Sequence, residues 1–201
     1  ARVTVPVLWD IKTSQIVSNC DDDIMRMLNS TFDDFTDSNL DLYPVELRSE
    51  IDEINDLIYS NVNDGVYRSG FAKTQNAYEA AVHKLFKTLD LLESRLSEHR
   101  YLTGNRLTEA DWRLFPTLIR FDAVYHGHFK CNLKRIIDYP NLYGYMCDLY
   151  HHNGIAETVD FDHIKRHYYM THPEINPTKI VPVGPSFKFD ASHNRARLSN
   201  D

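Results

Sequence analysis

The histidines and cysteines are the residues of this sequence that could bind a metal ion. His163 and His167 lie four positions apart, one helical turn, and such a pair can begin a zinc site. The segment HIKRH (163–167) lacks the glutamate of the HExxH motif, however, and the cysteines Cys20, Cys131 and Cys147 form no CxxC pair. We therefore predict no metal site, and we expect the histidines to have surface or packing roles.

A second candidate for chemistry is the segment VSNCDDDIMRML (17–28), which reads as the end of a strand, a turn and the start of a helix. A bare helix N-terminus is a ready anion site, but here Cys20 is followed at once by Asp21, Asp22 and Asp23. These carboxylates repel an anion, and they oppose formation of a thiolate at Cys20. We therefore do not expect Cys20 to be a nucleophile.

The net charge of the sequence argues against some classes of binding partner. The chain of 201 residues has a formal net charge of −7, which argues against nucleic acid or an anionic membrane surface as the main partner. No apolar run approaches the roughly 18 residues of a membrane span. Three scattered cysteines fit a reducing, cytoplasmic setting.

Two short β-rich runs open the chain and predict a hairpin. Val3 to Trp9 is apolar and β-branched, polar turn residues follow, and Gln15 to Ser18 is the second run. Two strands alone are not stable, and no later segment offers a further strand. The sequence also lacks an initiator Met and begins directly at this first run, so we expect that an upstream part is missing.

Apolar stripes predict two long helices after the hairpin. The first begins at Pro44 and keeps apolar residues at spacings of three and four as far as Val62. The second begins near Thr74 and continues to Leu96, over about six turns. The stretch from Gly65 to Lys73 is expected to be the connection between them.

A capping box marks the next helix. In RYLTGNRLTEADWRLF (100–115), Thr108 and Asp111 occupy the N-cap and third helical positions. The helix should continue to about Tyr125 and bend at Pro116, which has no amide hydrogen to donate.

The remaining sequence predicts more helix and then a tail. Pro140 opens a helix that extends through His151, short helical pieces follow in 154–170, and the proline-rich tail 173–201 reads as irregular. We therefore expect an all-helical domain over residues 44–172.

Six segments carry a resemblance to a known family. They are TVPVLWD (4–10), NDGVYRSGF (63–71), RYLTGNRLTEAD (100–111), RFDAVYHGHFKCN (120–132), ETVDFDHIKRHYY (157–169) and INP (175–177). The chain resembles the glutathionyl-hydroquinone reductases, the Xi class of glutathione transferases, from about residue 3 to 185. The resemblance implies a glutathione transferase-like fold, in which residues 1–30 are the C-terminal part of a thioredoxin-like α/β domain and an all-α domain follows. It also implies a homodimer.

The resemblance further implies a reaction. In that family a cysteine of a Cys-Pro-Trp segment attacks the sulfur of an S-glutathionyl hydroquinone, a small aromatic conjugate. The free hydroquinone leaves, and a second glutathione resolves the mixed disulfide. The attacking cysteine precedes the position of Arg2 in such proteins, so it is absent from these 201 residues.

The family's cis-proline turn and two pocket tyrosines have counterparts in this sequence, and one histidine lies beside them. Val5-Pro6 corresponds to the cis-proline turn that pairs with a thiol peptide, although an ordinary trans proline at a strand edge is the alternative. Tyr67 and Tyr168 match tyrosines that line the hydroquinone pocket, and phenols suit it as donors to ring oxygens. His167 is the nearest group that titrates around neutral pH. Packing is the alternative role for both tyrosines.

Three further matched residues have no settled role. Tyr125, His128 and Cys131 belong to the RFDAVYHGHFKCN segment (120–132) of the resemblance. A core or interface role is at least as well supported for them as a catalytic one.

The thiol-binding turn departs from the family pattern. Where the family has Glu-Ser, which binds the glutamyl end of glutathione, this sequence has Cys20 and Asp21. Asp21 would repel a ligand carboxylate and could itself cap the helix. Either the aspartates only cap and solubilise the helix, and glutathione binds weakly, or the native thiol lacks a glutamyl carboxylate, as a sugar-linked thiol such as mycothiol does.

Two other functions remain open. One is an omega-like thiol transferase that reduces small disulfides or dehydroascorbate. The other is a non-catalytic interaction module, because glutathione transferase-like helical domains also serve in larger assemblies. A Cys-Pro-Trp turn upstream would favour an enzyme.

Overall fold

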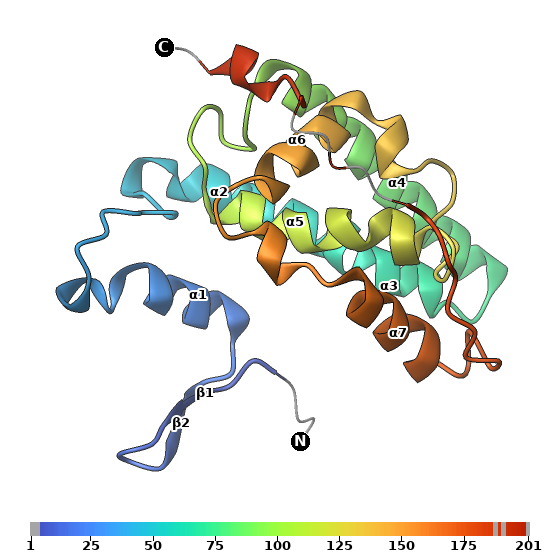
Figure 1. Ribbon diagram of the computed structural model, residues 1–201, viewed down its shortest axis with the longest axis horizontal. Helices are drawn as coiled ribbons and strands as arrows, with labels where there is room; N and C mark the ends of the chain where they lie inside the picture. Colours follow the sequence, from blue (N-terminus) through green and yellow to red (C-terminus); the bar gives the residue numbers. More distant parts are fainter. Residues whose placement is uncertain (1–4, 187–188, 190–191, 200–201) are drawn as a thin grey trace. The chain divides into compact units, whose positions relative to one another are not determined.

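The computed structural model describes residues 5–186, 189 and 192–199. The chain divides into two compact units, Ala1–Arg48 and Ser49–Asp201, which are described separately (Figure 1).

Unit 1 consists of a hairpin and one helix. Strand β1 (Leu8–Asp10) pairs antiparallel with β2 (Gln15–Ser18), and helix α1 (Asp21–Ser30) follows. Asp10 closes the turn by accepting hydrogen bonds from the amides of Lys12 and Thr13. The hairpin is as predicted, but the first strand was predicted too long, because residues 5–7 have no partner strand in the described part of the chain.

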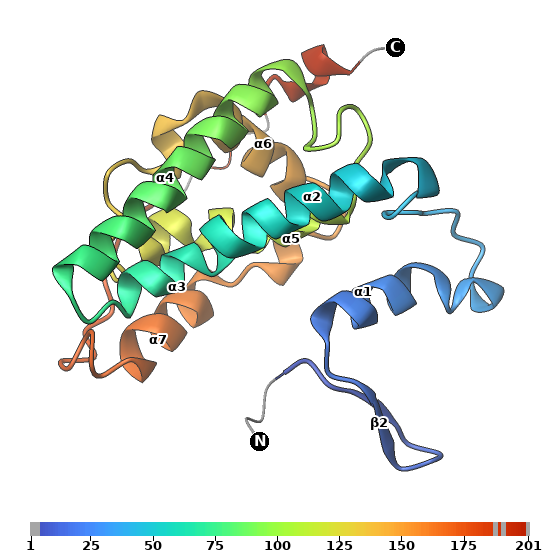
Figure 2. The same cartoon turned by 180° about the vertical axis from the view of Figure 1, so that it is seen from behind.

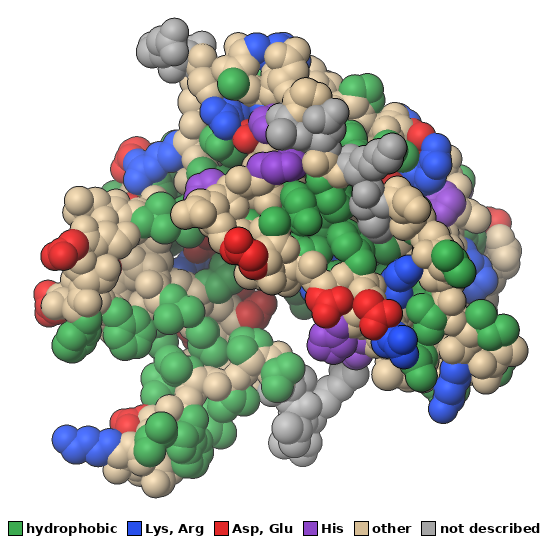
Figure 3. Space-filling view, in the orientation of Figure 1, with side chains coloured by type: hydrophobic (Ala, Val, Ile, Leu, Met, Phe, Trp, Pro, Cys, Tyr) green, Lys and Arg blue, Asp and Glu red, His purple; other side chains and the backbone are tan. Residues whose placement is uncertain are grey.

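The hairpin leaves large apolar side chains exposed. Val5 is 88% exposed, Ile16 61% and Trp9 50%. Hydrophobic side chains cover much of the hairpin and α1 in the space-filling view (Figure 3). Over the described residues the sheet has two strands, so each strand of the hairpin has one edge that pairs with no further strand.

Unit 2 begins with a helix that changes its winding. Helix α2 (Arg48–Ile58) continues into a π-helical segment, η3 (Tyr59–Asn63), in which hydrogen bonds span five residues. The predicted start at Pro44 was wrong by a few residues, because Pro44 instead caps a short 3₁₀ turn, η2 (Val45–Leu47). The apolar stripe itself is confirmed, since Ile51, Ile58 and Val62 are all buried.

The stretch predicted as a connection contains a helix, α3 (Gly65–Gly70). It packs against the long helix α4 (Gln75–Glu98), which begins where predicted and whose N-cap Thr74 accepts a hydrogen bond from the amide of Ala77. Tertiary packing outweighs the low helix propensity of the two glycines, because Val66 becomes fully buried. Figure 2 shows α3 continuing from the end of α2 and η3, with α4 returning alongside them.

Helix α5 (Glu109–Arg120) begins at the predicted capping box and continues into a second π-helical segment, η4 (Phe121–Tyr125). The fully buried Asp111 carboxylate accepts hydrogen bonds from the amides of Thr108 and Leu102 and from the hydroxyl of Tyr145. Burial raises the pKa of Asp111, while these hydrogen bonds oppose the increase.

The rest of unit 2 comprises two helices and short turns. A 3₁₀ turn, η5 (Ile136–Asp138), precedes α6 (Pro140–Tyr150), and η6 (Ala156–Thr158) precedes α7 (Phe161–Thr171). The tail is not wholly irregular, as had been predicted, because it contains the 3₁₀ turn η7 (Arg195–Leu198).

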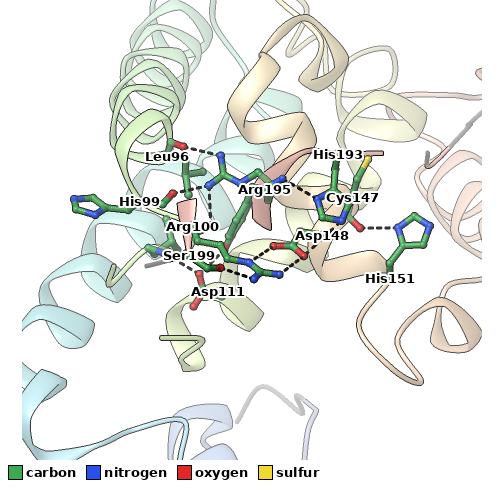
Figure 4. A network of polar contacts seen from close by, with 12 residues as sticks. Leu96, His99, Arg100, Asp111, Cys147, Asp148, His151, His193, Arg195 and Ser199 are labelled. Carbon is green, nitrogen blue, oxygen red and sulfur yellow. Dashed lines mark hydrogen bonds and ion pairs between the residues drawn. The ribbon is translucent and has the colours of Figure 1, made fainter. Parts of the chain in front are cut away.

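A buried arginine anchors the tail to unit 2 (Figure 4). Arg195, which is 2% exposed, donates to the carbonyl oxygens of Leu96, His99 and Arg100 at the C-terminal end of α4. Arg100 forms a bidentate ion pair with Asp148 on α6. The carbonyl oxygens at the C-terminal end of α4 have no donor within the helix. The Arg195 side chain, a cation about 100 residues further along the chain, thus caps them.

Two properties of the described residues bear on function. Each helix in this part of the chain is too short or too polar to span a bilayer. The same residues contain no cluster of three or more His, Cys, Asp or Glu side chains that could hold a metal ion.

Candidate active site

Three tyrosine hydroxyls from distant parts of the sequence meet in unit 2. Tyr67 lies on α3, Tyr125 ends η4, and Tyr168 lies on α7. The hydroxyl oxygen of Tyr168 is 2.6 Å from that of Tyr67 and 2.8 Å from that of Tyr125. The structure therefore brings together the two predicted tyrosines, and it adds Tyr125. We call these three residues the tyrosine chain.

Burial determines the direction of the hydrogen bonds in the tyrosine chain. Tyr125 is 3% exposed and Tyr168 6%, whereas Tyr67 is 37% exposed. Either hydroxyl of the pair Tyr125 and Tyr168 could be the donor, but a buried hydroxyl proton needs an acceptor, so we infer that Tyr125 donates to Tyr168. Tyr168 then donates to Tyr67, and the proton of Tyr67 points outward.

The two inner phenols are neutral. Burial raises the pKa of Tyr125 far above the ordinary value, and the neighbouring hydroxyls of Tyr168 and Tyr67 raise it further. Burial is also the main reason that the pKa of Tyr168 is raised. The tyrosine chain therefore leads from two buried neutral phenols to the hydroxyl of Tyr67 at its exposed end.

One buried ring holds the tyrosine chain together. The ring centroid of Phe129 is 5.3 Å from that of Tyr67, 5.5 Å from Tyr125 and 5.9 Å from Tyr168. Phe129 in turn requires a glycine opposite, because a Cβ atom at Gly70 would lie 2.3 Å from its ring. The close approach of α3 to Phe129 therefore places Tyr67.

His167 lies at the edge of this cluster. Its ring is 5.1 Å from that of Tyr168, on the exposed side of α7. In the described structure no hydrogen bond joins the His167 ring to the tyrosine chain. A catalytic role for His167 therefore stays a prediction.

The predicted thiol-binding residues share one end of the hairpin in unit 1. Leu8 of β1 pairs with Ser18 of β2. Val5-Pro6 lies just before β1 and Cys20-Asp21 lies just after β2, so antiparallel pairing brings both to the same end. The Val5–Pro6 bond is cis, in agreement with the resemblance.

The N-terminus of α1 differs from one expectation. Cys20, and not Asp21, occupies the N-cap position, and its side chain makes no capping hydrogen bond. Asp21, Asp22 and Asp23 fill the first turn, where their negative charge favours the helix dipole. The carboxylates thus stabilise this helix end through charge.

The three cysteines occupy different environments. Cys20 is exposed, whereas Cys131 and Cys147 are buried. Burial raises the pKa of Cys131 to about 12, so this thiol is inert near neutral pH. A core role, one of the two alternatives for Cys131, is the one that its environment supports.

The sequence leaves the role of Tyr125 open and does not predict its hydrogen bond to Tyr168. The pattern gives no sign that η4 is π-helical, and this winding decides where Tyr125 points. The available signal was the RFDAVYHGHFKCN segment, whose buried members surround the tyrosine chain.

Residues 75–146 match the family model of the glutathione S-transferase C-terminal domain. Together with the fold, this match defines a protein of the glutathione transferase class. The chain is 57% identical, over 92% of its length, to the glutathionyl-hydroquinone reductase PcpF of Sphingobium chlorophenolicum. It is 55% identical, over 96% of its length, to the glutathionyl-hydroquinone reductase YqjG of Escherichia coli.

Solved structures agree with this assignment. The glutathione-bound structure of YqjG matches with a TM-score of 0.95 over 98% of this chain and 64% of that one. A Xi-class glutathione transferase from Natrialba magadii matches with a TM-score of 0.95 and 51% identity, over 98% of this chain and 60% of that one. The chain belongs to this Xi class, the family of the glutathionyl-hydroquinone reductases. It spans 59% of the length of PcpF and of YqjG.

Proposed function

We propose that this protein reduces S-thiol conjugates of hydroquinones to free hydroquinones, with the thiolate supplied by a cysteine upstream of residue 1. The thiolate attacks the conjugate's sulfur, the bond from sulfur to the ring carbon breaks, and that carbon takes a proton. A second thiol releases the enzyme cysteine and forms a disulfide. The tyrosine chain carries the proposal, together with the similarity to PcpF and YqjG.

The tyrosine chain would act on the hydroquinone ring. Tyr67 is its exposed end and has a free proton, so it would donate to a ring oxygen of the conjugate. Tyr168 and Tyr125 hold this proton outward through their own hydrogen bonds. A flat aromatic substrate with oxygen substituents fits these rings better than an aliphatic disulfide does.

The α1 turn fits the glutamyl carboxylate of glutathione poorly. Three aspartates occupy the first helical turn, and Cys20 provides neither a hydroxyl donor nor a counter-charge for the ammonium. We therefore propose that a thiol without this carboxylate, such as mycothiol, competes with or replaces glutathione. Val5-Pro6 and Cys20-Asp21 are the residues proposed to contact the thiol.

The test is turnover of matched conjugates. The protein, expressed with its upstream segment, is assayed with a glutathionyl-hydroquinone plus glutathione, and with the mycothiol conjugate plus mycothiol. Turnover of either supports the reductase. The double variant Cys20→Glu, Asp21→Ser should shift the preference toward glutathione, and an unchanged preference would count against the proposed thiol. Activity on neither conjugate would favour a non-catalytic module.

By the same family resemblance we propose a homodimer in the cytoplasm. The three cysteines are compatible with a reducing compartment. Light scattering coupled to gel filtration tests the dimer.

A further inference from the structure

A second hydrogen bond between side chains lies next to the tyrosine chain. Nε2 of His128 is 3.2 Å from Nδ1 of His172, so one ring donates to the other. His128 follows η4, and His172 is the C-cap of α7. This pair therefore ties the end of α7 to the same segment that holds Tyr125.

The helical spacing places the two hydrogen bonds side by side. His172 lies four residues after Tyr168 on α7, so the two side chains share one face of the helix. His128 lies three residues after Tyr125, and its amide still bonds to the carbonyl of Val124 as in a helical turn. Tyr125 and Tyr168 form one hydrogen bond in the contact between η4 and α7. The hydrogen bond between His128 and His172 thus lies one helical turn further along the same contact.

Packing makes the histidine pair part of the same cluster. His128 is 5% exposed, and its ring centroid is 4.6 Å from that of Tyr169. The His172 ring is 5.7 Å from that of Tyr168 and 5.1 Å from that of Phe71. A shift of the histidine pair would therefore move Tyr168 as well.

Burial keeps the pair neutral, while the charges around it act in both directions: Lys130 and His167 lower the histidine pKa values and Glu174 raises them. Lys130 faces His128 from the segment after η4, Glu174 faces both rings from the segment after α7, and His167 faces His172 from α7. Burial is the main cause that lowers the pKa of His128, to about 4, and it also lowers that of His172. Near neutral pH one ring nitrogen donates and the other accepts.

We propose that His128 and His172 are positioning residues for Tyr168. The hydrogen bond between the two histidines fixes the last turn of α7, and this keeps the Tyr168 hydroxyl between those of Tyr67 and Tyr125. Neither histidine touches the substrate in this role. The catalytic part of the inference rests on the proposed function, whereas the structural part does not.

Substitutions can separate the effect of the hydrogen bond between His128 and His172 from the effect of histidine protonation. Gln mimics Nε2 of histidine and Asn mimics Nδ1, so the double variant His128→Gln, His172→Asn keeps a bond that no longer depends on pH. His172→Phe keeps the ring contacts and loses the bond. His83→Phe, at an exposed position on α4, is the matched control for replacing a histidine by phenylalanine.

The first readout is kinetic. In the protein expressed with its upstream segment, His172→Phe should lower kcat for the hydroquinone conjugate about tenfold with little change in KM, because displacement by a fraction of an ångström misaligns the donor. The double variant should recover most of this loss, and His83→Phe should match the wild type. Equal kcat in His172→Phe and wild type would overturn the catalytic role.

The second readout does not depend on the reaction. Tyrosine is labelled with carbon-13 at Cζ, and the signal of Tyr168 is assigned with Tyr168→Phe. This signal should move in His172→Phe at pH 7. In the wild type it should titrate with a midpoint near pH 4, the value given above for His128. In the double variant it should stay constant, with circular dichroism at each pH to check that the helices remain folded.

These outcomes are distinguishable from failure of the reductase. If the wild type turns over no conjugate, the proposed function fails, and the Tyr168 signal still decides whether the pair positions this residue. A Tyr168 signal that is the same in His172→Phe and wild type would overturn the inference, whatever the activity.

Discussion

At the scale of the residue, Tyr168 is the centre of the candidate site because it is the only member of the tyrosine chain bonded to both others. It accepts from a buried donor and donates to a half-exposed acceptor. Each member of the chain therefore has a different part in activity and in stability, although all three are tyrosines.

Replacing each tyrosine by phenylalanine should separate these parts. Tyr67→Phe should reduce kcat most, by about a hundredfold, because it removes the outward donor. Tyr168→Phe leaves the Tyr125 hydroxyl buried without a partner and should also lower the free energy of unfolding by about 1–3 kcal/mol. Tyr125→Phe should have the smallest effect on kcat. If Tyr125→Phe lowered kcat more than Tyr67→Phe does, the inferred direction of the hydrogen bonds, from Tyr125 through Tyr168 to Tyr67, would be contradicted. Steady-state kinetics and urea denaturation measure both quantities.

At the scale of the element, the sequence predicts the features that depend on contacts between residues a few positions apart. Thr108 with Asp111 was recognised because a capping side chain bonds to an amide three positions away. Helix α3 was missed, since Gly65 and Gly70 argue against a helix until Phe129 and Leu85 pack against it. Tyr67 and Tyr168 were known only by resemblance, because their contact joins residues 101 positions apart.

The two glycines of α3 provide a matched test of this packing. Gly70→Ala would place Cβ 2.3 Å from the Phe129 ring and should lower the free energy of unfolding by about 1–3 kcal/mol. Gly65→Ala would place Cβ 3.8 Å from that of Leu85, an ordinary contact, and should be neutral or stabilise the helix by up to about 1 kcal/mol. Urea denaturation followed by circular dichroism compares them. Equal effects at both positions would mean that Phe129 moves aside freely.

At the scale of the whole molecule, contacts between distant segments hold unit 2 together. Arg195 of the tail caps the end of α4, and Asp111 at the start of α5 bonds to Tyr145 of α6. No local pattern predicts such contacts. The tail was accordingly predicted to be irregular, although one of its arginines is among the buried residues of the fold.

Removing this arginine should destabilise unit 2. Arg195→Met keeps a long apolar stem but leaves the carbonyl oxygens of Leu96, His99 and Arg100 without their donor, and it should cost about 2–3 kcal/mol. Arg197→Met, two positions away and exposed, is the control and should be nearly neutral. Thermal unfolding of both variants makes the comparison. A similar melting temperature for both would show that other contacts anchor the tail.

Stability should also fall in mild acid through His128. Its pKa is about 4 in the folded protein and about 6.5 in an unfolded chain, so the unfolded state binds protons first as the pH falls. The contribution of His128 is therefore complete above pH 6.5 and declines as the pH falls toward 4. Between pH 7.5 and 5 the wild type should lose about 2 kcal/mol more than His128→Gln in urea denaturation. Parallel losses in the two proteins would contradict this.

The π-helical segment η4 has a consequence for how such proteins diverge. A turn with hydrogen bonds over five residues contains one residue more than an α-helical turn. Because a π turn accommodates its extra residue by turning less per residue, deleting a single residue within 121–125 would restore α-helical winding and leave the side chains beyond the segment on nearly the same face. Relatives without the π turn should therefore show a one-residue gap at this point in an alignment, with the helix on either side unchanged.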